Sequence, residues 1–173
     1  MTFNETHIEF EASIAELEAE IEELADELEG LDEDNPLYPQ KAQRRADLAT
    51  QRKGAVWACP GRGEDADVHE DDDFPMWNEP VDGVTLGAVR AGAMDSITSE
   101  VVDNGGEGSE ILLVADGSVK APYVGDDMTD KQEAGAVGDL HPWYREWCAA
   151  RINELLDPES GNEKHSSGSP KET

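Results

Sequence analysis

The chain has 173 residues, enough for one domain with accessory segments rather than two full domains. It carries 41 acidic and 13 basic residues, a net charge of −28 with histidine neutral. This charge excludes general binding to nucleic acid, because phosphate contacts need a basic surface.

The sequence also shows no sign of membrane insertion or secretion. No run of about eighteen apolar residues predicts a membrane span. Residues 1–12 have neither the cationic region nor the apolar stretch of a secretory signal. Two cysteines are too few for a disulfide framework or a four-thiolate zinc site. We therefore expect a protein located in the cytoplasm.

The strong acidity has two explanations, intrinsic disorder or adaptation to molar salt. Low hydrophobicity with high net charge is typical of disordered chains. Here, however, the apolar fraction is 37% and the chain contains four tryptophans. At an ionic strength of about 1 M the Debye length falls to ~3 Å, so repulsion between surface carboxylates is largely screened. The composition therefore predicts a folded protein from an extreme halophile.

Residues 8–31 carry the clearest periodic pattern in the chain. Apolar residues recur there at spacings of three and four, which predicts a helix with a coiled-coil seam. The seam residues are Ile14, Leu17, Ile21, Leu24, Leu28 and Leu31. Gly30 and the segment 32–36 are expected to end this helix.

A second helix is predicted from about residue 39 to residue 53, with Pro39 in its first turn. Residues 11–34 contain twelve acidic residues and no base, whereas residues 41–53 carry a net charge of +4. A short connection favours antiparallel packing. The predicted fold class is mainly α, with an N-terminal antiparallel helical (coiled-coil) hairpin over residues 1–56. The alternative is one long acidic helix followed by a solvated basic loop.

The second helix offers only a thin apolar side to this seam. Its facing residues are Ala42, Ala46 and Ala49 with a single leucine. Small side chains cover little apolar area, so a strip of leucines stays exposed in a monomer, and such strips mark interaction sites. We expect a homo-oligomer, a helical protein partner, or docking of Trp57 along the strip.

The rest of the chain divides by composition. Residues 57–80 are predicted to be an acidic linker rich in proline and glycine. Residues 81–157 are predicted to be a small, mainly helical domain with one or two short strands. Residues 158–173 lack an apolar period and are predicted to be a disordered tail.

Four segments are expected within the small domain. They are a short strand or a turn at 81–89, a helix at 90–104, a buried strand or a helix at 110–117, and a helix at 140–156. Asp139 is expected to cap the last helix, with Pro142 in its first turn.

The last helix concentrates the aromatic residues. Trp143, Tyr144 and Trp147 lie within five positions, and a domain this small cannot easily bury three large aromatics on one helix face. Tryptophan and tyrosine also dominate binding hot spots. We predict that Trp147 anchors the helix in the core while Trp143 contacts a partner; the alternative is that both are core. Cys148, on the apolar side, is predicted to be a core thiol.

No set of residues forms a catalytic or metal-binding motif. The pairs Cys59/His69 and His141/Cys148 lack zinc-site spacing. The acidic run at 64–73 lacks the glycine and terminal glutamate of an EF-hand loop. No P-loop or nucleophile elbow is present. We therefore predict no catalytic residue, metal or cofactor, and a chain that is not an enzyme. An enzyme or regulator whose site one sequence does not reveal is a further alternative.

A series of short motifs follows from residue 81 to residue 162. They are a valine-x-leucine start, a V-x-x-P motif and a closing amphipathic helix ending in I-x-x-L. The residues that carry them are Val84, Leu86, Val119, Pro122, Leu140, Trp143, Trp147, Ile152, Asn153 and Leu155. In this arrangement the chain resembles the tail assembly chaperones of long-tailed viruses.

The resemblance implies a non-enzymatic protein that coats the long tape-measure protein during tail assembly and is absent from the finished particle. It would act in the cytoplasm of a salt-adapted host. The alternative is a structural virion or adaptor protein that oligomerises through the hairpin. The candidate residues for partner binding or oligomerisation are Ile14, Leu17, Ile21, Leu24, Leu28, Trp143, Trp147 and Leu155.

Overall fold

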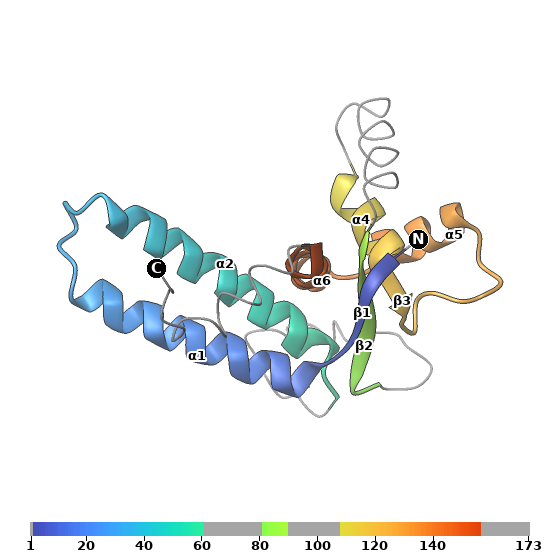
Figure 1. The fold of residues 1–173 in the computed structure, drawn as a ribbon, viewed down its shortest axis with the longest axis horizontal. Coiled ribbons are helices and arrows are strands. Elements are labelled where there is room, and N and C mark those ends of the chain that lie inside the picture. The colour runs from blue at the N-terminus through green and yellow to red at the C-terminus, as the bar shows by residue number, and fades with distance from the viewer. Residues whose placement is uncertain (1, 61–80, 90–107, 157–173) are drawn as a thin grey trace, which may run out of the picture.

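The computed structural model describes residues 2–60, 81–89 and 108–156. Within them the structure is mainly helical, with one small antiparallel sheet (Figure 1). The elements in chain order are β1 (Thr2–Glu9), α1 (Phe10–Glu29), α2 (Leu37–Ala58), β2 (Gly83–Val89), α4 (Ser109–Gly117), β3 (Ser118–Lys120), α5 (Asp130–Gly138) and α6 (Pro142–Leu156). The predictions made for residues 61–80, 90–107 and 157–173 lie outside the described residues.

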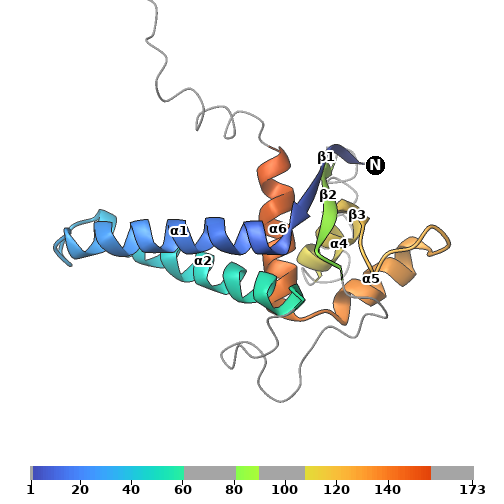
Figure 2. The ribbon, with the colours of Figure 1, turned by 90° about the horizontal axis from the view of Figure 1, so that it is seen from below.

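Helices α1 and α2 form the predicted antiparallel hairpin (Figures 1 and 2). The turn between them is closed by local hydrogen bonds: the Gly30 amide donates to the Glu27 carbonyl, and the Leu37 amide donates to the Asn35 side chain at 2.9 Å. The second helix continues past the predicted end at Lys53 and reaches Ala58. The basic segment is therefore helical and not a solvated loop.

Ion pairs join the acidic helix to the basic one. Lys41 Nζ lies 2.6 Å from Glu27, Arg52 Nε lies 3.2 Å from Glu18, and Arg44 Nη2 lies 3.7 Å from Glu20. All three pairs are partly exposed to solvent, where such a pair contributes about 0–1 kcal/mol. Their main effect is to favour one register of the hairpin over others.

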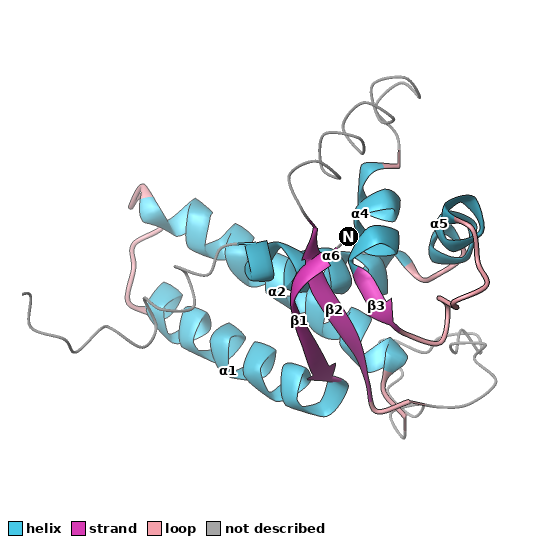
Figure 3. Ribbon diagram, turned by 45° about the vertical axis from the view of Figure 1, so that its right-hand side comes forward, coloured by secondary structure: helices cyan, strands magenta, loops and turns pink. Residues whose placement is uncertain are grey.

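The sheet has the order β1-β2-β3, and both of its pairings are antiparallel (Figure 3). Strand β2 confirms the strand alternative for residues 81–89. Strand β1 is a correction, because the sequence analysis assigned no strand to residues 2–9. It also began its first helical pattern at residue 8, whereas the helix begins at Phe10. A bulge between Phe3 and Thr6, with Asn4 at a φ of 52°, interrupts the β1–β2 register.

The carboxy-terminal half resolves one alternative and requires one correction. Residues 110–117 belong to helix α4, which confirms the helix alternative for this segment. Asp139 does not begin the last helix: it ends α5, a helix that the sequence analysis missed, and its amide donates to carbonyls of that helix. Helix α5 begins with a capping box between Thr129 and Gln132. Pro142 does lie in the first turn of α6, as predicted.

One hydrophobic core joins the hairpin to the sheet and to α6. Phe10 packs 5.5 Å from Trp147, and Trp57 packs 5.5 Å from Tyr144, measured between ring centroids. Trp57 therefore lies in this core rather than along the leucine strip. The predicted boundary at residue 56 falls inside α2, and core residues come from both sides of it. The far half of the hairpin extends away from this core (Figure 2).

The close crossing of α2 and α6 depends on Gly54. A Cβ atom at this position would overlap the backbone carbonyl of Trp143, which cannot rotate away. We expect Gly54→Ala to lower the melting temperature, because overpacking costs typically 1–3 kcal/mol and outweighs a helix-propensity gain of about 1 kcal/mol. The matched control is Gly135→Ala in α5, where the added methyl meets open space and is expected to stabilise the chain slightly. Equal melting temperatures for both variants would contradict the crossing.

Candidate protein-binding site

Burial of the predicted seam decreases along α1. Ile14 and Leu17 are each 1% exposed, whereas Ile21, Leu24 and Leu28 are half-buried. Ile14 and Leu17 belong to the core that joins the hairpin to the sheet and to α6, whereas Ile21 and Leu24 are only partly buried against that core. We call Ile21, Leu24 and Leu28 the distal row.

The incomplete cover of the distal row follows from the composition of α2. Ala42 and Ala49 are half-buried and Ala46 is exposed, so the α2 face carries little apolar volume. Leu48 is fully buried and packs with the core, whereas Leu37, the other leucine of α2, is half exposed. The strip that was predicted to stay exposed is therefore only half-buried in the far half of the hairpin, and Ile21 and Leu24 pack against the core.

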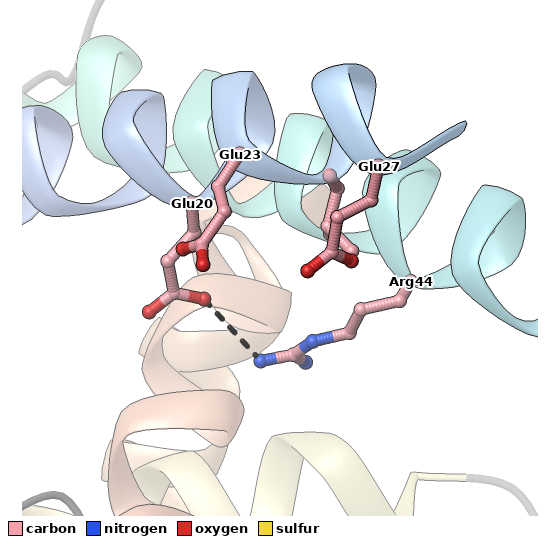
Figure 4. Close-up of a pocket in the computed structure, with 5 residues that line it drawn as sticks. Glu20, Glu23, Glu27 and Arg44 are labelled. Carbon is pink, nitrogen blue, oxygen red and sulfur yellow. Dashed lines mark ion pairs between the residues drawn. The ribbon is translucent and has the colours of Figure 1, made fainter. Parts of the chain in front are cut away.

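An acidic groove lies beside the distal row (Figure 4). Its volume is about 390 Å³, and it is lined by Glu20, Glu23, Leu24, Glu27 and Arg44. Arg44 pairs with Glu20, and Lys41 pairs with Glu27, while Glu23 makes no ion pair with any described residue. The sequence analysis missed these glutamates, although their spacing of three and four places them on one flank of α1.

The two tryptophans of α6 differ in burial, although both pack with the hydrophobic core. Trp147 is fully buried, and its indole Nε1 donates to Ser13 Oγ at 2.8 Å. Trp143 is half-buried, with the Lys53 ammonium 4.9 Å from its ring centroid and the His141 ring 4.6 Å away. Contact of Trp143 with a partner stays a prediction. Leu155 is half-buried near β1, and neither residue belongs to the groove beside the distal row.

A small polar cluster is buried beneath α6. Tyr123 OH lies 3.0 Å from Ser118 Oγ, 2.9 Å from Tyr144 OH and 3.8 Å from Cys148 Sγ. Burial raises the pKa of Cys148 to about 12 and raises the pKa of both tyrosines well above 10. At neutral pH these groups stay protonated, so Cys148 is a core thiol, as predicted, and not an activated nucleophile.

This cluster predicts loss of stability at alkaline pH. In the unfolded chain, cysteine and tyrosine release protons near pH 8.5 and 10, at which the folded protein still holds them. The contribution of these groups to the free energy of unfolding is therefore constant below about pH 8.5. Above the pKa that each group has in the unfolded chain, the free energy of unfolding falls by about 1.4 kcal/mol per pH unit for that group. Urea unfolding at a series of pH values measures this slope. Cys148→Ala removes one group and should make the fall between about pH 9 and 10 shallower; an unchanged slope would contradict the burial of the thiol.

The described residues contain no cluster that could hold a metal ion, since no three histidine, cysteine, aspartate or glutamate side chains converge there. The Cys59 thiol donates to Glu11 Oε1 at 3.3 Å, and His69, whose pairing with Cys59 lacked zinc-site spacing, lies outside the described residues. No helix in the described part of the chain is long and apolar enough to cross a membrane.

No protein-family model, curated protein or solved structure matches this chain.

Proposed function

We propose that the chain is a non-enzymatic assembly chaperone or scaffold that binds an extended helical partner along the distal hairpin. The observation that carries this proposal is the distal row: Ile21, Leu24 and Leu28 share one face of α1 and are left half-buried in the hairpin with α2. Fully burying a leucine or isoleucine side chain contributes about 1.5–3 kcal/mol, and part of that gain is still open to a partner here.

The geometry of the row suits a helix. Its members are spaced by three and four residues, so they lie on one face of α1, and they span about two helical turns. An amphipathic helix laid along such a row docks with residues at the same spacing. The resemblance to tail assembly chaperones supports a tape-measure-type partner, a long helical protein. The composition supports action in the high-salt cytoplasm of a halophilic host.

Site-specific photo-cross-linking in the cells that make the protein tests this proposal. With the photoreactive residue at position 24, we expect cross-links to one long protein with a heptad-type sequence. The same residue at position 131, an exposed site on α5, serves as the control and should not cross-link to that protein. Cross-links only between copies of this chain would favour the alternative, an adaptor that oligomerises through the hairpin.

Fractionation separates a chaperone from a virion component. A tail assembly chaperone is expected in virus-producing cells and not in purified particles. Retention of the chain in purified particles would contradict the chaperone proposal and favour a structural virion protein.

A further inference from the structure

The groove beside the distal row is lined by more acidic than basic side chains. Three carboxylates from α1, those of Glu20, Glu23 and Glu27, face a single guanidinium from α2 (Figure 4). Leu24 lines the same groove, so an apolar contact and an acidic rim are presented together. From this juxtaposition, and resting on the proposed function, we infer that the partner is an amphipathic helix whose apolar stripe is flanked by lysine or arginine.

The existing ion pairs leave room for added cations. Arg44 approaches Glu20 only to 3.7 Å, and the carboxylates of Glu20 and Glu27 both keep about four-tenths of their side-chain exposure. Glu23 is exposed and makes no ion pair with any described residue. A cationic side chain arriving beside Leu24 therefore meets at least one unpaired carboxylate at the groove rim.

A second copy of this chain is a poorer occupant. Most basic residues of α2 in a second copy already form ion pairs within their own chain: Lys41, Arg44 and Arg52 pair with α1. Lys53 lies over the Trp143 ring, which leaves Arg45 as the one base of 41–53 without such a contact among the described residues. The remaining surface of a second hairpin is acidic, and like charges brought together disfavour the contact.

High salt does not abolish this selection. At about 1 M salt the Debye length of ~3 Å screens distant charges, but it is comparable to the separation of two groups in direct contact. The rim therefore acts on the residues that flank the partner's apolar stripe and not on the partner's overall charge.

Two synthetic peptides of about 21 residues test the inference, each with leucine at heptad positions a and d. One carries lysine at positions e and g, and the other carries glutamate there. Binding to the full chain is measured by fluorescence anisotropy, in KCl at which circular dichroism shows the chain folded. We expect the lysine peptide to bind about tenfold more tightly, or better, since each rim contact changes from attraction to repulsion.

Paired variants locate the contact. Glu23→Gln is expected to weaken binding of the lysine peptide by roughly two- to fivefold, the range supplied by one exposed ion pair. Glu22→Gln is the matched control, because it removes the same charge from the next residue, which does not line the groove. Leu24→Ser is expected to weaken binding further, and a melting curve in the same buffer verifies that this variant is folded.

Several results would overturn the inference: equal binding of the two peptides, binding of neither, an equal effect of the two glutamine variants, or self-association of the chain that Leu24→Ser abolishes. The proposed function is judged separately. Cross-links from position 24 to a long helical protein, with no preference between the peptides, would leave that function standing. They would overturn only the inference that lysine or arginine flanks the partner's apolar stripe.

Discussion

Replacing Trp147 with alanine is expected to unfold the chain under conditions in which Trp143→Ala stays folded. The Trp147 side chain is fully buried between α1 and the core, and its loss removes packing against Phe10 and Tyr144. Large aromatic-to-alanine changes in a core cost about 3–5 kcal/mol. The Ser13 hydroxyl, itself buried, also loses its indole partner. That sum is a large share of the 5–15 kcal/mol typical of a whole domain.

Trp143→Ala is the matched variant, because it removes the same side chain four positions earlier on the same helix. Its half-buried ring loses part of its packing against the core, the contact with the His141 ring and the contact with Lys53. An exposed cation–π contact contributes about 0.5–1 kcal/mol. Thermal melting followed by circular dichroism compares the two. If both variants unfold alike, Trp143 is a core residue like Trp147, and its predicted contact with a partner is wrong.

Removing salt is expected to destabilise the fold strongly. Two like charges 10 Å apart in water repel by about 0.4 kcal/mol, and at about 0.01 M salt the Debye length of ~30 Å hardly reduces this. Summed over a net charge of −28, the repulsion reaches several kcal/mol. The ion pairs of the hairpin act in the opposite direction, since salt weakens them, but three partly exposed pairs contribute at most about 3 kcal/mol.

The repulsion is therefore the larger effect, and stability should rise with salt. We expect the melting temperature to increase by roughly 10 °C or more between about 0.01 M and 1 M KCl. Sucrose is a control that separates screening from excluded-solute stabilisation, because it stabilises compact states without screening charge. A melting temperature that does not change with KCl would contradict adaptation to high salt.

Local patterns of this sequence were enough to predict the hairpin and the roles of two residues in α6. The alternating spacing of isoleucine and leucine in α1, and the opposite charges of the two helices, depend only on neighbours along the chain. The burial of Trp147 and of Cys148 followed from their place on one face of a helix. The capping box of α5 was also present in the sequence, at Thr129 and Gln132, but its short and weakly apolar helix gave no periodic signal.

Tertiary contacts decided the rest. Residues 2–9 form a strand because Gly83–Val89 lies beside them, a pairing between segments more than seventy positions apart that no local pattern encodes. The seam of α1 is one uninterrupted pattern in the sequence. Only the assembly of the core that joins the hairpin to the sheet and to α6 separates the buried Ile14 and Leu17 from the half-buried Leu24 and its acidic groove. Hydrophobic periodicity indicates which residues share a face of a helix. Which neighbouring element covers each part of that face depends on packing across the whole chain.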